Sequence, residues 1–336
     1  MLASVARVTV DVPLRRATIL TTDGGIIVPK SEEVKLSFEW GGLKLAGSLH
    51  LPAGAGPHPA VVMAQGSGPA DRDSGGYFRP IRQAFIGRGV ATFAFDKPGC
   101  GESSGEWQRY ALEGRAEQLV AGLEVVRNHR AIRGERVGIF GHSQGGWLVQ
   151  KLAGRDGALA FAIASAGPTL CVEDQILYDC EQSISSQGDD EHEVRDAMAL
   201  TRALHRAAVD DADFEFIESQ LLRPASVQPW YDRFSTIDDA RDWQHVKLLL
   251  GETHEPVSDL ERVACPFLAV YGGLDALLPP WRGAEESGRA LAAAGSPDVT
   301  VVVLPLGDHR MQDPDTGDFV DGYLNLLGDW TAHRAN

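Results

Sequence analysis

Cysteine is scarce in this chain of 336 residues, which contains only four. The four are widely separated and none forms a Cys-x-x-Cys pair: Cys100, Cys171, Cys180 and Cys265. A disulfide framework or a zinc site needs paired cysteines at closer spacing, so the sequence predicts neither. The same scarcity favours a reducing, cytoplasmic compartment.

Long apolar runs are also missing. No stretch of about 18 uncharged apolar residues occurs, and a membrane-spanning helix needs at least that length. Arg7 and Asp11 interrupt the apolar residues near the N-terminus, which argues against a secretory signal. The chain has no P-loop, no dinucleotide fingerprint after a strand and no His-Glu-x-x-His pair, so we expect no cofactor and no metal.

Basic residues are few compared with acidic ones. The chain has 31 lysines and arginines against 47 aspartates and glutamates, a formal net charge of −16 at pH 7. Nucleic acids and anionic lipids bind to basic surfaces, so this balance argues against nucleic acid and membrane as partners. We expect a small-molecule partner, and the sequence gives no indication of the oligomeric state.

The sequence does contain an alternation of strand and helix patterns. Runs of consecutive apolar residues, typical of strands buried on both faces, occur at 60–63, 91–95, 137–140, 159–164, 267–271 and 299–304. Helical patterns occur at 78–88, 112–130, 145–152, 284–294 and 319–330. Two alternating runs, 34–38 and 43–49, predict an antiparallel pair. The predicted fold class is α/β, with a mostly parallel, doubly wound sheet.

The chain divides into an extension, a core and an insertion. Residues 1–30 are predicted to form a β-rich N-terminal extension, and residues 31–168 and 263–336 to form the α/β core. Residues 169–262 are polar and helix-like, with an amphipathic pattern over 194–208. Ordinary connections in α/β units have roughly two to six residues. We therefore expect this insertion to be a helical cap, or lid, over the carboxyl ends of the strands.

Two stretches match Gly-x-Ser-x-Gly, a pattern that can mark a serine nucleophile on a strand-to-helix turn: GESSG at 101–105 and GHSQG at 141–145. Ser143 directly follows a predicted strand and precedes a predicted helix. The glycines around it allow the strand and the helix to approach closely. Ser103 lies in a loop well past its strand, where the pattern is typical of a turn. Ser143 is therefore the candidate nucleophile.

A serine nucleophile needs a base, and the base needs a carboxylate that orients it. In an open α/β sheet, reactive groups lie on loops just past the carboxyl ends of the strands. Asp275 follows the predicted strand 267–271, and His309 follows the predicted strand 299–304. We predict that His309 is the base and that Asp275 is its partner.

Other residues compete for these two roles. Asp308 directly precedes His309 and is expected to point away from it, while Glu173 and Asp174 follow an earlier strand. His142 is adjacent to the serine and is held by the same turn. Four further histidines lie in the polar insertion, where we expect them at the surface: His192, His205, His245 and His254.

The reaction also needs an oxyanion hole, which consists of two backbone N–H groups directed at the developing negative charge. The residue after the nucleophile, Gln144, supplies one of them. The second is expected from the glycine-rich loop after strand 60–63, at Ser67 or, one position earlier, at Gly66. A plain glycine-rich turn is the other interpretation of this loop.

Taken as a set, these segments resemble the α/β-hydrolase superfamily over about residues 32–336. The loop 66–73, GSGPADRD, is similar to the Gly-Ser-Gly-Pro-x-x-Arg-Asp loop of bacterial esterases and of prolyl-oligopeptidase-like (dienelactone-hydrolase-like) hydrolases. Residues 96–103 resemble the family's loop after the fourth strand, and 141–146, 271–275 and 307–309 resemble its triad segments. The chain departs from the family at Gln65, Cys100 and Arg310, of which Arg310 replaces a usual glycine beside His309.

The resemblance implies an α/β-hydrolase fold with a helical cap, and a serine hydrolase that cleaves carboxylic esters through an acyl-enzyme on Ser143. The same groups can cleave amides or thioesters, because the fold does not choose among them. An exopeptidase or amidase and an acyl thioesterase therefore stay open as alternatives. A ligand-binding protein without turnover is the alternative from another class.

Two features bear on the substrate. Arg72, near the predicted oxyanion donors, can bind a substrate carboxylate or form a structural ion pair with Asp73 or Asp96. Aromatic residues of the insertion can line an apolar pocket or pack the insertion itself: Tyr178, Phe214, Phe216, Trp230, Tyr231, Phe234 and Trp243.

Overall fold

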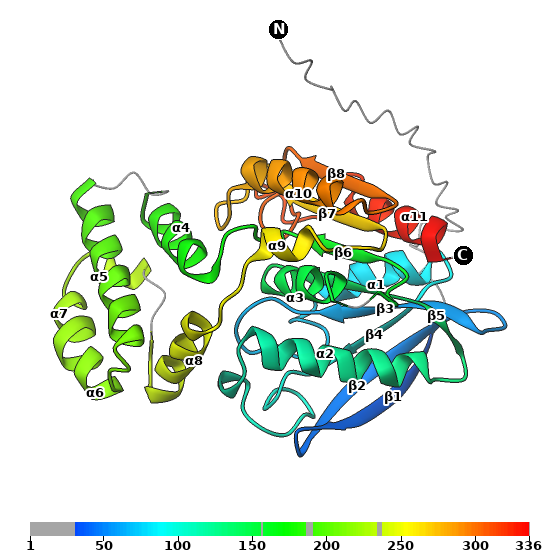
Figure 1. The fold of residues 1–336 in the computed structure, drawn as a ribbon, viewed down its shortest axis with the longest axis horizontal. Helices are drawn as coiled ribbons and strands as arrows, with labels where there is room; N and C mark the ends of the chain where they lie inside the picture. The colour runs from blue at the N-terminus through cyan, green and yellow to red at the C-terminus, as the bar shows by residue number, and fades with distance from the viewer. Residues whose placement is uncertain (1–30, 156, 186–190, 234–236, 336) are drawn as a thin grey trace, which may run out of the picture.

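A computed structural model places the chain in space (Figure 1) and describes residues 31–335 except 156, 186–190 and 234–236. The predicted N-terminal extension, residues 1–30, lies outside the described residues, as does Phe234. The rest consists of a sheet with helices on both faces and, to one side, a group of helices.

Within the described residues, eight strands form one sheet in the order β1-β2-β4-β3-β5-β6-β7-β8. The strands are β1 (Ser31–Trp40), β2 (Leu43–Pro52), β3 (His58–Ala64), β4 (Ala91–Phe95), β5 (Ile132–His142), β6 (Ala162–Ser165), β7 (Phe267–Gly272) and β8 (Val299–Leu304). β2 pairs antiparallel with β1 and β4, and all other neighbours are parallel. The predicted mostly parallel α/β sheet is confirmed.

Helices cover both faces of this sheet: α1 (Phe78–Ile86), α2 (Leu112–Arg127), α3 (Gln144–Ala153), α10 (Pro280–Ala294) and α11 (Tyr323–Ala335), with a short turn η1 (Trp107–Arg109) before α2. α1 packs against α11, and α2 packs against α3. Helix α11 begins later than the predicted residue 319, because Phe319 pairs with Gln312 in an isolated β-bridge.

Strand β8 differs from the prediction that it is buried on both faces. It lies at the edge of the sheet, with Val299 exposed and its other residues half-buried. A run of β-branched apolar residues is compatible with an edge strand as well as a central one, so the sequence pattern alone did not separate them.

Helices occupy the chain between β6 and β7: α4 (Val172–Ser185), α5 (Glu191–Val209), α6 (Phe214–Ile217), η2 (Glu218–Leu222), α7 (Arg223–Ala225), η3 (Tyr231–Arg233), α8 (Ala240–Gly251) and α9 (Pro256–Leu260). Leu204, Trp230 and Trp243 are buried in an apolar cluster of this region, separate from the main core. Helices α5, α6 and α7 stand apart from the sheet, at the left of Figure 1, whereas α9 packs against α3. The assignment of residues 169–262 as a cap, or lid, stays a prediction.

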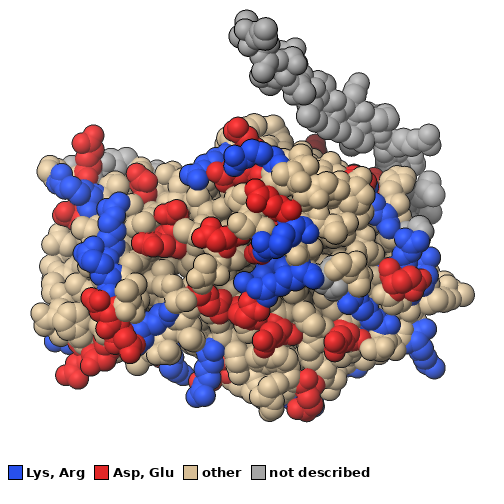
Figure 2. Space-filling view, viewed as in Figure 1, with Lys and Arg blue, Asp and Glu red and all other residues tan. Residues whose placement is uncertain are grey.

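Charged side chains are mixed over the surface. Figure 2 shows lysines and arginines interspersed with aspartates and glutamates across both the core and the helical insertion on the face drawn. In the described part of the chain, no helix combines the length and the apolar character that crossing a membrane requires.

Candidate active site

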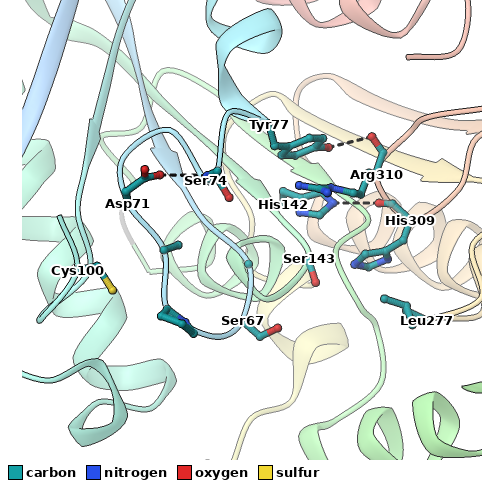
Figure 3. Close-up of a pocket in the computed structure, with 14 residues that line it drawn as sticks. Ser67, Asp71, Ser74, Tyr77, Cys100, His142, Ser143, Leu277, His309 and Arg310 are labelled. Carbon is teal, nitrogen blue, oxygen red and sulfur yellow. Dashed lines mark hydrogen bonds between the residues drawn. The ribbon is translucent and has the colours of Figure 1, made fainter. Parts of the chain in front are cut away.

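Ser143 occupies the sharp turn between β5 and α3. Its φ of 56° and ψ of −123° lie in a region that residues other than glycine rarely adopt. The Ser143 N–H donates to the Ser165 carbonyl at 3.0 Å, and its own carbonyl accepts from the Gly146 N–H at 2.7 Å. The strand edge and the first helical turn thus hold the strained residue, whose hydroxyl projects from the turn (Figure 3).

Glycines beside Ser143 make this turn possible. A Cβ atom on Gly141 would lie 2.0 Å from the carbonyl oxygen of Gly145, and one on Gly145 would lie 2.3 Å from that of Ala64. Both contacts are with backbone atoms, which cannot rotate away. The strand, the helix and the neighbouring β3 therefore approach closely because these positions have no side chain.

Gly145→Ala is expected to destabilise the protein by about 3 kcal/mol, at the upper end of the usual cost of overpacking. Urea unfolding followed by far-UV circular dichroism measures this change. Gly251→Ala is the matched control, because a Cβ at Gly251 meets nothing within 4 Å. An equal effect of the two substitutions would contradict the close approach described here.

His309 and Asp275 are hydrogen-bonded to each other. His309 Nδ1 lies 2.8 Å from Asp275 Oδ2, and because a carboxylate only accepts, Nδ1 carries the proton. The other carboxylate oxygen, Oδ1, accepts from the N–H groups of Leu277 at 2.8 Å and Leu278 at 3.2 Å. Asp275 is buried. Its orientation is fixed on both sides, which leaves Nε2 of His309 free to accept a proton.

Ser143 and His309 line the same pocket, whose volume is about 630 Å³. In Figure 3 the serine hydroxyl and the imidazole lie beside the same open space. No hydrogen bond joins these two side chains in the described structure, and such bonds often tighten only when substrate binds. The structure thus brings Ser143, His309 and Asp275 together at the carboxyl ends of β5, β8 and β7.

Two residues without a predicted function hold the His309 loop. His142 Nε2 lies 2.9 Å from the His309 carbonyl oxygen, and the Tyr77 hydroxyl donates to the Arg310 carbonyl at 3.1 Å (Figure 3). Burial and the nearby His309 lower the pKa of His142 to about 3, so His142 is neutral and donates through Nε2. The Arg310 guanidinium lies 4.8 Å from the centre of the Tyr77 ring. His142 therefore supports the His309 backbone.

The competing residues have other partners. Asp308 Oδ1 accepts from the N–H groups of Arg310 and Gln312, and Glu173 lies 3.6 Å from His205 in the insertion. The Ser103 hydroxyl accepts from the Ala46 N–H and donates to a loop carbonyl, as expected for turn chemistry. Asp174 is exposed on α4.

The predicted oxyanion donors belong to two segments, the loop after β3 and the first residue of α3. The N–H groups of Gly66, Ser67 and Gln144 have no acceptor among the described residues, as is usual for Gln144 at the first position of a helix. A Cβ atom added to Gly66 would lie 3.3 Å from Ser143 Cβ, so the loop is in contact with the nucleophile. These N–H groups are free to bind an oxyanion.

The two substrate features have structural partners. Arg72 Nη2 lies 2.5 Å from Asp96 and 2.7 Å from Glu102, so the structure favours the ion-pair interpretation of Arg72. The described aromatic residues of the insertion do not line the pocket, and most of them pack within the insertion. Phe216 is 50% exposed.

The described residues contain no group of three or more side chains suited to hold a metal.

Comparison with curated proteins identifies relatives that are hydrolases. The chain is 30% identical to 2,6-dihydropseudooxynicotine hydrolase of Paenarthrobacter nicotinovorans over 154 residues, which cover 46% of this chain and 40% of the relative. It is 24% identical to esterase EstD of Thermotoga maritima over 238 residues, which cover 69% of this chain and 50% of the relative. The chain thus spans half or less of the length of these two relatives.

Solved structures share the fold. The Pyrococcus furiosus esterase Pf2001 superposes with a TM-score of 0.60 at 14% identity, covering 92% of each chain. The 2,6-dihydroxy-pseudo-oxynicotine hydrolase superposes with a TM-score of 0.56 at 20% identity, covering 92% of this chain and 69% of the other. A model of the alpha/beta hydrolase family matches residues 58–321. The predicted resemblance and fold are confirmed, and the chain belongs to the α/β hydrolase family.

Proposed function

We propose that the protein hydrolyses carboxylic esters with Ser143 as the nucleophile, His309 as the general base and Asp275 as the carboxylate that orients it. One observation carries the proposal: the 2.8 Å hydrogen bond between His309 and Asp275 is formed beside the pocket into which Ser143 projects from its strained turn. Nucleophile, base and orienting group are the parts that serine hydrolysis requires.

Acylation follows from this arrangement. The ester carbonyl binds near Ser143, and His309 Nε2 takes the hydroxyl proton as Oγ attacks the carbonyl carbon. Asp275 stabilises the imidazolium that forms. The N–H groups of Ser67 and Gln144 bind the negative oxygen of the tetrahedral intermediate. His309 then gives its proton to the leaving alcohol.

Deacylation repeats these steps with water. Water enters the vacated alcohol position, His309 removes one of its protons, and the hydroxide attacks the acyl carbon. The second tetrahedral intermediate collapses, the proton returns from His309 to Ser143 Oγ, and the acid leaves. No further chemical group is needed in either half of the cycle.

The ester is favoured as the substrate class for two reasons. An esterase, EstD of Thermotoga maritima, is among the named relatives. The pocket volume of about 630 Å³ suits a small organic ligand. Its lining includes the small residues Ser67, Ser74 and Gly75, which leave room for a short acyl or alcohol group.

A fluorophosphonate probe tests the nucleophile. We expect one equivalent of probe on Ser143, located by peptide mass spectrometry, and loss of p-nitrophenyl butyrate hydrolysis in proportion to labelling. Ser103→Ala, in the second Gly-x-Ser-x-Gly stretch, is the matched control and is expected to label like the wild type. Hydrolysis that continues after complete labelling, or labelling at another residue, would contradict the proposal.

Comparison of leaving groups tests the substrate class. We expect the wild-type protein to turn over p-nitrophenyl butyrate much faster than an aminoacyl anilide or butyryl-CoA. A faster rate on the anilide would favour the amidase, and a faster rate on the CoA ester would favour the thioesterase.

A further inference from the structure

Two buried basic side chains contact the predicted oxyanion loop. Lys97, in the loop after β4, is 3% exposed, and Arg115, in the first turn of α2, is 8% exposed. Neither forms an ion pair with a carboxylate in the described part of the chain. Burial of a cation without an anion is costly, so the polar groups that surround these two side chains must compensate for it.

Backbone carbonyls of the loop are those polar groups. Lys97 Nζ donates to the carbonyl oxygens of Gly66 and Gly68, each at 2.5 Å. Arg115 donates from Nη2 to the Gln65 carbonyl at 2.9 Å and from Nη1 to the Gly66 carbonyl at 3.3 Å. Both side chains therefore donate to the Gly66 carbonyl.

The geometry of the peptide bond transmits this contact to the reaction site. In a trans peptide, the carbonyl and the N–H of the same unit point in opposite directions. The Gly66 carbonyl shares its peptide unit with the Ser67 N–H, so cations that bind the carbonyl direct that N–H to the other side. The same contact polarises the unit and strengthens the N–H as a donor.

The same loop also contacts the nucleophile. A Cβ atom on Gly66 would lie 3.3 Å from Ser143 Cβ and 3.5 Å from the His142 carbonyl oxygen. Ser67 lines the pocket together with Ser143. The short loop that Lys97 and Arg115 bind is thus also the loop that contacts the nucleophile.

Arg115 also connects the second oxyanion donor. Its Nη1 donates to the side-chain oxygen of Gln144, whose backbone N–H is the other predicted donor. A guanidinium is a rigid, planar fork, so its contacts set the distance between the groups that it binds. Arg115 therefore links the loop of Ser67 to the start of α3. These two segments carry the two predicted oxyanion donors.

We propose that Lys97 and Arg115 are positioning residues that assemble and polarise the oxyanion hole and fix the Ser67 N–H as its second donor. The proposal rests on the proposed serine hydrolase. Neither side chain touches the substrate, and each acts through peptide groups that do. The guanidinium charge of Arg115, whose pKa burial lowers only to about 10, also favours the negative charge of the tetrahedral intermediate.

Lys97→Met tests this proposal, because methionine has a similar length and no charge. Removal of a direct oxyanion donor lowers kcat by about 10²- to 10³-fold, and removal of its support should cost about 10- to 100-fold. We expect KM for p-nitrophenyl butyrate to change little. The affinity for a phenylboronic acid, which forms a tetrahedral anion on the serine, should fall by the same factor as kcat. Lys35→Met is the matched control, with a side chain that is 73% exposed.

Two measurements separate positioning from a structural role: kcat per site labelled by a fluorophosphonate, and the affinity for the boronic acid. Partial unfolding lowers the number of labelled sites without changing kcat per labelled site. Unchanged kcat per labelled site and unchanged boronate affinity in Lys97→Met would overturn the proposal while the proposed function stands. A wild-type protein that is not labelled at Ser143 would overturn the proposed function instead, and this proposal with it.

Arg115→Lys is the second variant, and it tests the proposed positioning role if Lys97→Met does not fold. It keeps the charge, but a single ammonium cannot bridge the loop and the Gln144 side chain as the guanidinium does. We expect a fall of about tenfold in kcat and an equal fall in boronate affinity. Wild-type values for both in folded Arg115→Lys would overturn the proposal.

Discussion

Ser143→Ala is expected to lower kcat for ester hydrolysis by about 10⁶-fold, the order of the loss when a serine protease loses its nucleophile. The alanine has no oxygen to form the acyl-enzyme, so only the oxyanion donors and the binding pocket can still act. Steady-state and single-turnover rates on p-nitrophenyl butyrate measure the loss. The same variant should not react with the fluorophosphonate.

Stability separates this loss from misfolding. Ser143 adopts a φ of 56°, and alanine adopts that conformation no more easily than serine, so we expect Ser143→Ala to unfold at the same urea concentration as the wild type. Ser143→Gly should be equally inactive and, because glycine accepts positive φ, free of a strain of about 1 kcal/mol or more. Part of that gain is offset by the greater freedom of glycine in the unfolded chain. Retention of more than about 1% of wild-type kcat by folded Ser143→Ala would contradict the proposed role.

The core of the fold could be predicted because strand burial has a clear sequence signature. Five of the six apolar runs became central strands, and the alternation with helices set the α/β class. Position within the sheet has no such signature. The run of β8 has the same composition as that of a buried strand, but its place at the edge depends on which strands pair, and pairing is decided by the whole chain.

The proposed catalytic residues were accessible to sequence analysis for a similar reason. Asp275 and His309 each follow a recognisable strand, and the ends of parallel strands meet at one edge of the sheet. Their hydrogen bond could not be inferred from spacing, since 34 residues separate them and the angle of each loop depends on its own turn.

Sequence analysis missed the proposed positioning residues Lys97 and Arg115, although the sequence pattern around Arg115 indicated a buried charge. Arg115 lies on the apolar stripe of α2, between Leu112 and Leu119, where a charge is unexpected. A cation on the buried face of a helix implies a polar partner inside the protein, but the sequence does not say that the partner is the carbonyl of Gly66. Lys97 left a weaker signal, because a lysine in a loop is most often exposed.

Asp275→Asn is expected to lower kcat by about 10⁴-fold, as when a triad carboxylate is replaced by its amide. In the wild type, Oδ1 of Asp275 accepts from the N–H groups of Leu277 and Leu278, while Oδ2 accepts from His309 Nδ1. An asparagine has one acceptor oxygen, and we expect it to accept from the two backbone N–H groups of Leu277 and Leu278. The amide nitrogen must then face His309.

That arrangement reverses the tautomer of the base. The amide N–H donates to His309 Nδ1, so the ring proton moves to Nε2, and Nε2 can no longer take the proton of Ser143. The fold should be unaffected, because the amide has the shape of the carboxylate and keeps its backbone contacts. We therefore expect a fall in kcat with little change in KM or in the urea midpoint.

Asp308→Asn is the matched control, one residue before His309 in the chain. Its carboxylate accepts from two backbone N–H groups of its own turn, those of Arg310 and Gln312, and an amide oxygen can replace it there. We expect kcat of Asp308→Asn within about threefold of the wild type, because both hydrogen bonds are kept and an ordinary hydrogen bond contributes only about 0.5–1.5 kcal/mol. A loss of kcat in Asp308→Asn as large as that in Asp275→Asn would contradict the assignment of Asp275 as the carboxylate that orients His309. The partner of His309 Nδ1 would then have to change during turnover.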